Sequence, residues 1–355
     1  MGELIEHPLY EEDLRCVASL SLPWEKLQDA AVLVSGATGL VGRCLVDVLM
    51  YKNLRESLGC RVYAMGRNTE RAKRCFSYCW ESPLLEFLAH DVNEPITSTP
   101  VYLDYAVHLA SNTHPVAYAT DPIGTITANI IGLKHLLDAC IGRGLRRFAF
   151  VSSNEVYGEN RGDVELFAED YCGYINCNTL RAGYPESKRC AETLCQAYIR
   201  QAQMDIVIPR LTRSYGPTML QSDTKAISQF IKKALEGEDI VLKSTGAQYY
   251  SYTYMADAVA GLLTVLLKGE CGQAYNVADV SSDITLKDLA RLVAGYAERR
   301  VVFELPDAVE SAGYSTATKA RLDGAALRSL GWMPRYDMSS GLKRTLEMLE
   351  DVTGN

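Results

Sequence analysis

Short apolar runs alternate with longer segments of helical spacing from residue 31 onward. The apolar runs cover residues 31–34, 61–65, 85–89, 106–110, 148–151 and 206–208. Segments at 40–51, 122–141 and 184–203 carry the spacing of helices. Continuous apolar runs are typical of strands buried on both faces, and strands that alternate with helices form parallel sheets. The pattern therefore predicts an α/β fold with a doubly wound parallel sheet.

The pattern loosens after about residue 210. Helical segments at 224–236, 257–268 and 285–299 are separated by short strand-like pieces at 274–277 and 301–304. This predicts a smaller, mixed α/β region over the carboxyl ends of the parallel strands, where ligands bind in open sheets. We expect an N-terminal helical extension at 1–30, a dinucleotide-binding domain at 31–210 and a substrate-binding domain at 211–355. A chain that crosses back between the last two is the alternative arrangement.

Composition and charge narrow the classes of function. The 355 residues are 48% hydrophobic and 23% charged, as in ordinary soluble proteins, and the net charge of −8 argues against binding to nucleic acid or anionic membrane. The eleven cysteines and five histidines show no metal-site spacing, so we expect no bound metal. We expect the cysteines to be free thiols in a reducing cytoplasm. The N-terminus is acidic, unlike a signal peptide, and the apolar stretch 258–267 is shorter than the ~20 residues of a membrane span.

A glycine-rich turn follows the first strand and opens a helix. It consists of Gly36, Ala37, Thr38, Gly39, Leu40, Val41 and Gly42. Glycines let the backbone turn tightly and approach a pyrophosphate, whose charge then lies at the helix N-terminus. Later strand ends carry further candidate cofactor contacts, namely Asp91, Val92, Leu109, Ala110 and Ser111. Their order along the chain favours a Rossmann-type dinucleotide site over a simple helix cap.

The end of the second strand bears on which nicotinamide cofactor is bound. NAD-binding folds generally place an acidic residue there to hold the ribose hydroxyls, but this chain has Gly66, Arg67 and Asn68. Arg67 could pair with a ribose 2′-phosphate, as in NADP, or stack on adenine and tolerate NAD. We predict NAD, with weak rejection of NADP.

Tyr184 and Lys188 lie four residues apart in a predicted helix and therefore share a face. A nearby ammonium favours the phenolate and lowers the pKa of a tyrosine. Such a tyrosine can take the proton from a sugar hydroxyl while hydride leaves for a nicotinamide. After a nucleotide-binding pattern, this pair indicates catalysis rather than a surface lysine beside a capping tyrosine.

The glycine turn, the serine-rich strand end at Ser152 and Ser153, and the YPESK segment together resemble the extended short-chain dehydrogenase/reductase family, which modifies nucleotide-sugars. The resemblance covers nearly the whole chain from residue 31. Within that family the sequence is most similar to UDP-glucuronate decarboxylases. That likeness lies in Glu169, Asp170, Tyr171, Asn176, Arg181, Ala182, Tyr184, Glu186, Lys188, Arg189, Ala191, Glu192 and Thr193.

The resemblance gives the stretch Ser153, Asn154, Glu155 a catalytic meaning. Family members that dehydrate a sugar typically have Asp at the position of Asn154, and an amide cannot supply the proton that a departing hydroxyl needs. Similar decarboxylases lack that Asp but keep the neighbouring glutamate. The resemblance thus implies that Ser153 bonds the reacting hydroxyl and that Glu155 serves C5 of the sugar. A mere strand cap is the structural alternative.

The resemblance also exposes departures in the substrate region. Relatives carry an arginine that binds the substrate pyrophosphate where this chain has Tyr250, and another where it has Thr218, whereas Arg213 replaces an asparagine. The diphosphate site is therefore either relocated to Arg213, Lys319 or Arg321, or the substrate is not a standard nucleotide-sugar. An arginine can bind phosphate or carboxylate through two parallel hydrogen bonds, and the structural alternative is that Arg213 simply pairs with an acidic neighbour. Tyr118, Asn154 and Arg181 are further substrate-side candidates by resemblance.

The expected activity is decarboxylation of a UDP-glucuronate-like nucleotide-sugar through transient oxidation at C4. A nucleotide-sugar 4-epimerase is the second hypothesis, since it needs Tyr184 and Lys188 but no C5 carboxylate. A 4,6-dehydratase-like enzyme and a non-catalytic nucleotide-binding protein rank lower. The resemblance further implies a homodimer formed through the two long helical segments at 122–141 and 184–203.

Overall fold

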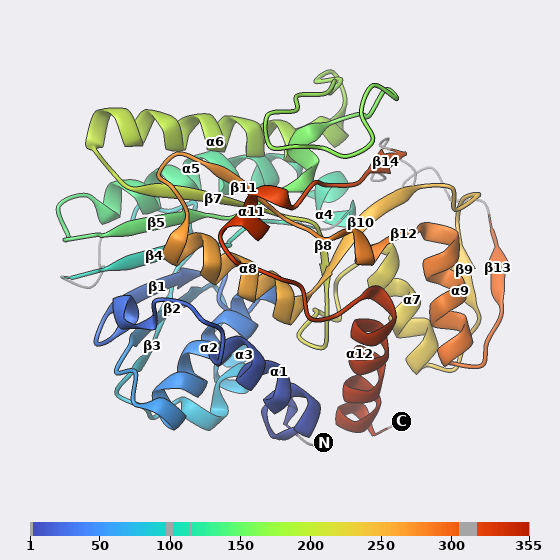
Figure 1. Ribbon diagram of the computed structural model, residues 1–355, viewed down its shortest axis with the longest axis horizontal. Helices are drawn as coiled ribbons and strands as arrows, with labels where there is room; N and C mark the ends of the chain where they lie inside the picture. Colours follow the sequence, from blue (N-terminus) through green and yellow to red (C-terminus); the bar gives the residue numbers. More distant parts are fainter. Residues whose placement is uncertain (1–2, 97–101, 114, 305–317, 355) are drawn as a thin grey trace.

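The computed structural model describes residues 3–96, 102–113, 115–304 and 318–354. Its centre is a parallel sheet of eight strands in the order β11-β7-β5-β4-β1-β2-β3, with β6 beside β7 (Figure 1). These strands are β1 (Ala31–Ser35), β2 (Arg61–Gly66), β3 (Leu85–Ala89), β4 (Tyr105–His108), β5 (Arg147–Phe150), β6 (Ser152–Ser153), β7 (Ile206–Leu211) and β11 (Ala274–Val277). The predicted doubly wound sheet is therefore present.

Helices cover both faces of this sheet (Figure 1). On one face α5 (Pro122–Cys140) and α6 (Gly183–Ala202) pack on Leu33 and Met65, and on the other α2 (Leu40–Glu56) and α8 (Met255–Lys268) pack on Val32 and Val34. Successive side chains of a strand point to opposite faces, so a continuous apolar run supplies both layers. None of the helices in the described ranges is both long enough and apolar enough to cross a bilayer.

The region beyond β7 forms smaller sheets. In one, β10 is the common neighbour of β8, β12 and β14, and in the other β9 pairs with β13. These strands are β8 (Arg213–Tyr215), β9 (Ile240–Leu242), β10 (Tyr249–Tyr254), β12 (Asp283–Thr285), β13 (Val301–Phe303) and β14 (Lys319–Ala320). Among the described residues the remaining α-helices are α1 (Pro8–Ala18), α3 (Thr69–Cys75), α4 (Pro115–Thr120), α7 (Ala226–Leu235), α9 (Leu286–Tyr296), α11 (Ala325–Ser329) and α12 (Met338–Thr353).

The chain returns to the large sheet after entering this smaller region. Helix α8 packs against β7, and β11 then adds a parallel strand at the edge of the large sheet. Part of the range 211–355 therefore belongs to the layer of the large sheet. The crossing places β8 and β10 directly over the carboxyl ends of the central strands (Figure 1).

The N-terminal extension is tied to the smaller region through buried polar groups. In α1, the fully buried carboxylate of Asp13 accepts hydrogen bonds from Tyr254 Oη at 2.5 Å and Arg344 Nη2 at 2.8 Å. Arg344 also pairs with Glu12 at 3.0 Å. Because Tyr254 ends β10 and Arg344 lies in α12, one carboxylate joins three elements that are distant in sequence.

We expect Asp13→Ala to lower the free energy of unfolding by roughly 3–5 kcal/mol, because removing one member of a buried ion pair leaves its partners unsatisfied. Glu11→Ala is the matched control, since Glu11 makes an exposed pair with Arg55 and such pairs contribute at most about 1 kcal/mol. Urea denaturation of both variants measures the difference. Equal stabilities would contradict a structural role for Asp13.

Candidate active site

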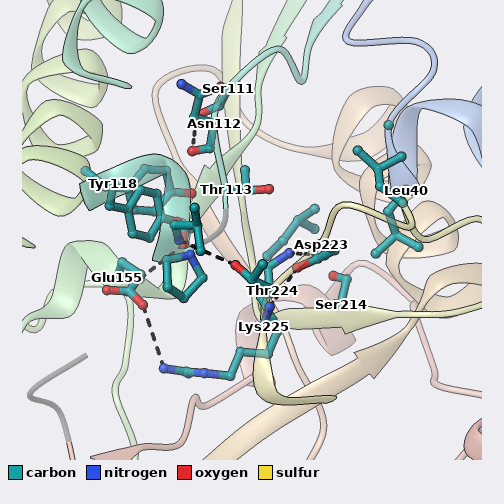
Figure 2. A pocket seen from close by; sticks show the side chains of 18 of the residues that line it. Leu40, Ser111, Asn112, Thr113, Tyr118, Glu155, Ser214, Asp223, Thr224 and Lys225 are labelled. Carbon is teal, nitrogen blue, oxygen red and sulfur yellow. Dashed lines mark hydrogen bonds and ion pairs between the residues drawn. The ribbon is translucent and has the colours of Figure 1, made fainter. Parts of the chain in front are cut away.

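A cavity of about 750 Å³ runs along the carboxyl ends of the central strands and under the smaller region. Figure 2 shows Tyr118 and Glu155 on one side of it and Leu40 of the glycine turn on the other. Apart from Lys319 and Arg321, the alternative phosphate candidates, the structure brings to this cavity all but one of the residues predicted to bind cofactor or substrate or to act in catalysis. They are Gly36, Thr38, Gly39, Leu40, Val41, Gly42, Arg67, Asp91, Val92, Leu109, Ala110, Ser111, Tyr118, Ser153, Asn154, Glu155, Arg181, Tyr184, Lys188, Arg213 and Tyr250.

The glycine turn is shaped by close backbone approach. Gly36 has φ +69°, and a Cβ there would lie 2.8 Å from the backbone nitrogen of Ala110. A Cβ on Gly42 would lie 2.2 Å from the Gly36 carbonyl oxygen. Helix α2 begins after Gly39 without a side-chain cap, so its first N–H groups are available to an anion. These features fit the pyrophosphate of a dinucleotide.

The end of the cavity beside β2 and β3 carries mixed charge. Arg67 is largely exposed and lies 3.8 Å from Asp91, a weak surface pair. Asn68 is the one predicted residue that does not line the cavity, because its side chain caps α3 by accepting from the Arg71 N–H at 2.9 Å. Arg71 was not singled out from the sequence, yet its guanidinium donates to the Thr38 carbonyl at 2.8 Å and braces the glycine turn.

Tyr184 and Lys188 lie on the buried face of α6, beside the strand end that carries Ser153. Burial raises the pKa of Tyr184 to about 12, and a hydrogen bond with Ser153 acts in the opposite direction. Burial also lowers the pKa of Lys188 to about 8, and its ammonium donates to the Val151 carbonyl at 2.9 Å. The sequence predicted that Lys188 lowers the pKa of Tyr184, but burial has the largest effect on this phenol, and the neighbouring charges that act on it are those of Glu155, which raises the pKa, and Arg181, which lowers it.

A polar network holds α6 against α5 and the loop after β4. Asn129 Nδ2 donates to Ser187 Oγ at 2.9 Å, and Ser111 Oγ donates to Asn129 Oδ1 at 2.8 Å. Ser187 Oγ in turn donates to the Tyr184 carbonyl at 2.8 Å. The network links the predicted cofactor contact Ser111 to the backbone of Tyr184. Sequence reasoning missed Ser187, which only a three-dimensional pairing of two helices reveals.

A second polar pair lies beneath the cavity floor. Ser35 Oγ and His108 Nδ1 are 2.7 Å apart at the adjacent ends of β1 and β4. Burial lowers the pKa of His108 to about 3, with the Lys188 charge acting in the same direction, so the imidazole is neutral. Ser35 Oγ also accepts from the N–H groups of Leu109 and Ala110, which fixes the loop against Gly36.

Aromatic rings and charges alternate along the wall nearest Ser153. The Tyr118 and Tyr184 rings stack with centroids 4.8 Å apart, and the guanidinium of Arg181 lies 4.9 Å from the Tyr118 centroid. Arg181 Nη2 donates to Glu155 Oε2 at 2.7 Å, and Arg213 Nη2 lies 3.7 Å from Glu155 Oε1.

Arg213 in turn stacks on Tyr250, with 3.6 Å between the guanidinium carbon and the ring centroid. The predicted substrate-side residues therefore form one continuous surface. Asn154 is buried at its edge and begins the short helix η4 (Asn154–Tyr157).

Comparison with known proteins places this geometry in a family. Residues 32–278 match the family model described as NAD dependent epimerase/dehydratase family. The chain is 32% identical over 311 residues to UDP-glucuronic acid decarboxylase 6 of Arabidopsis thaliana, covering 88% of this chain and 86% of the relative. It is 30% identical to UDP-glucuronic acid decarboxylase 1 of Danio rerio over 318 residues, covering 89% and 72%.

Solved structures agree on the fold. A dTDP-glucose 4,6-dehydratase of Streptomyces venezuelae with NAD bound superposes with a TM-score of 0.79 at 23% identity, covering 91% of this chain and 98% of that one. A UDP-glucuronic acid 4-epimerase of Bacillus cereus, in complex with UDP-glucuronic acid and NAD, superposes with a TM-score of 0.76 at 20% identity, covering 91% and 99%. The chain therefore belongs to the NAD-dependent epimerase/dehydratase family of extended short-chain dehydrogenases/reductases.

Proposed function

We propose that the protein decarboxylates a nucleotide-sugar of the UDP-glucuronate type and uses NAD as its resident cofactor. The observation that carries this proposal is the placement of Glu155, with Asn rather than an acid at 154, beside Ser153 and Tyr184 in one cavity. The naming of its relatives as UDP-glucuronic acid decarboxylases supports the same activity. The glycine cradle supports the dinucleotide.

The polar groups around the Ser153 strand end divide the first step of this reaction among them. Tyr184 accepts the proton of the C4 hydroxyl, and Ser153 hydrogen-bonds the same oxygen. Bound NAD would supply the hydride acceptor, the positive charge that favours the Tyr184 phenolate, and later the hydride that restores the C4 alcohol. Lys188 keeps its ammonium beside the strand end through the Val151 carbonyl. Oxidation at C4 thus creates a β-keto acid without any leaving hydroxyl.

The carboxyl group then leaves as carbon dioxide. Its bonding electrons pass into the C4–C5 enolate, which takes a proton at C5 before the ketone is reduced, so the cycle is redox-neutral. We assign proton transfer at C5 to Glu155, whose carboxylate is held by Arg181. Asn154 has no acidic proton to give a departing hydroxyl, which disfavours dehydration.

A 4-epimerase is the second candidate because it uses the same Tyr184 and Lys188. The fold similarity to the Bacillus cereus UDP-glucuronic acid 4-epimerase favours this alternative only weakly. It leaves the ion-paired Glu155 without a chemical role. Decarboxylation gives Glu155 a role in the reaction, and epimerisation does not.

We expect the purified protein to release carbon dioxide from UDP-glucuronate and to form a pentose nucleotide lighter by that mass. Mass spectrometry of a panel of nucleotide-sugars separates the candidates, because decarboxylation, dehydration and epimerisation give loss of carbon dioxide, loss of water and no mass change. UDP-glucose serves as the neutral control. An unchanged mass with an inverted C4 in the product would favour the epimerase instead.

Tyr184→Phe removes only the phenol oxygen, and we expect it to lower turnover by about 10²–10⁴-fold, as loss of a general base does. The variant should retain dinucleotide, because the glycine cradle is unchanged. Denaturing the protein and identifying the released dinucleotide checks this, with NAD rather than NADP expected. Activity close to wild type would exclude Tyr184 as the base.

We further propose a cytoplasmic homodimer. Helices α5 and α6 lie side by side on one face, and α5 exposes Ile123, Ile126 and Ile131 to solvent, with Ile123 75% exposed. Apolar side chains spaced along one helix favour a second copy packing there. All eleven cysteines are unpaired, as a reducing compartment favours.

Solution scattering at micromolar concentration tests the dimer, and we expect twice the chain mass. Ile123→Lys should shift the equilibrium toward monomer, because it places a charge in the apolar contact. Glu298→Lys, in the smaller region, is the control for the added charge. A wild-type mass of one chain would contradict this assembly.

A further inference from the structure

Three guanidinium nitrogens in the cavity wall are buried without a hydrogen-bond partner among the residues that the structure describes. They are Nε and Nη1 of Arg181 and Nη1 of Arg213. Arg181 uses Nη2 for Glu155, and Arg213 approaches the same carboxylate only at 3.7 Å, beyond hydrogen-bond length. A buried donor of a charged group is costly to leave unsatisfied. The wall is therefore built to receive an acceptor.

The charges of this wall do not balance. Two guanidinium groups face one carboxylate, and within the described residues neither arginine has another ion-pair partner. The adjacent phenols stay neutral, since burial raises the pKa of both Tyr118 and Tyr250. One positive charge thus remains for a ligand, and the acceptor that fits is an anion.

Arg213 is the arginine that is free to bind that anion. Glu155 keeps its short bond to Arg181, so Arg213 can bind a ligand without leaving Glu155 unpaired. Stacking on Tyr250 holds the guanidinium of Arg213 in place, and the pairing of β8 with β10, where Arg213 lies opposite Tyr252, positions its backbone. A fixed guanidinium fork matches a carboxylate through two parallel hydrogen bonds.

We infer that Arg213, assisted by Arg181, binds the C6 carboxylate of the sugar and makes this enzyme selective for acidic over neutral sugars. This inference rests on the proposed function, in which Glu155 acts at C5. C6 is bonded to C5, so the anion nearest to Glu155 is the carboxylate, whereas the diphosphate is attached across the ring at C1. The site thus assigns to Arg213 the recognition of the group that the reaction removes.

The chemistry also fixes how Arg213 affects the rate. The carboxylate loses its charge as the C5–C6 bond breaks and the electrons move into the enolate. An ion pair with that carboxylate is therefore stronger in the bound substrate than in the transition state of this step. Such an interaction improves binding rather than the rate of bond cleavage. Departure of neutral carbon dioxide then leaves Arg213 beside Glu155 again.

The test compares three ligands by calorimetry on the NAD-loaded enzyme: UDP-glucuronate, UDP-glucose and UDP. The Tyr184→Phe background prevents turnover during the titration. We expect Arg213→Met to weaken the binding of UDP-glucuronate by about 10- to 100-fold, because charge-assisted hydrogen bonds are lost. The affinities for UDP-glucose and UDP should be nearly unchanged. Arg213→Lys should recover part of the loss, because it restores the charge without the fork.

Arg291→Met is the matched control, since Arg291 is an exposed arginine of α9 outside the cavity. In the otherwise wild-type enzyme, Arg213→Met should raise KM for UDP-glucuronate far more than it lowers kcat. Folding of the variant is checked by its thermal midpoint and retained NAD. An equal loss for all three ligands would assign Arg213 to the phosphates and overturn the inference.

Failure of the inference and failure of the proposed function give different results. If carbon dioxide is released but Arg213→Met keeps the preference for the acid, the function holds and the role of Arg213 is wrong. If no carbon dioxide forms but the preference for UDP-glucuronate over UDP-glucose depends on Arg213, the role of Arg213 in binding the carboxylate is supported and the proposed decarboxylation is wrong. If the protein with Arg213 intact binds UDP-glucuronate no more tightly than UDP-glucose, the inference is overturned.

Discussion

Parallel pairing of the central strands is the constraint on which the site depends. Because β1, β4 and β5 run in register, Ser35, His108 and Phe150 stand next to one another at the same edge. The loop after each strand must then share a narrow space, and this is why Gly36 touches the backbone of Leu109 and Ala110. The glycine cradle, the loop behind it and the Ser153 strand end are consequences of one hydrogen-bonding register.

The sequence predicted those parts of the molecule whose signal is local. Apolar runs located the central strands, and the glycine turn and the Tyr184–Lys188 spacing located the cavity, because each reflects contacts within a few residues. Strand β10 was not predicted as an element. It consists of Tyr249, Tyr250, Ser251, Tyr252, Thr253 and Tyr254, a polar-aromatic run whose burial follows from three neighbouring strands distant in sequence.

The electrostatics of the site were harder to predict from the sequence. The sequence left open whether Arg213 grips a ligand or pairs with an acidic neighbour, and the structure places it against Glu155 with one nitrogen unsatisfied. The Tyr184–Lys188 spacing predicted a lowered pKa for Tyr184, whereas burial in the structure raises it. The depth of burial is a property of the whole fold and is not encoded in that spacing. Charge spacing in a sequence says which groups can meet, but not how much water remains between them.

The clasp between α1 and α12 has a consequence for how the molecule opens. His7, which caps α1, bonds Asp351 of α12, and Glu12 and Asp13 of α1 bond Arg344 of α12. These contacts join the first and last helices of the chain, which lie near each other (Figure 1). Neither helix can detach without exposing the buried polar groups of the other. Local opening therefore begins with the two sequence ends as a single cooperative unit, and their amide hydrogens should exchange together.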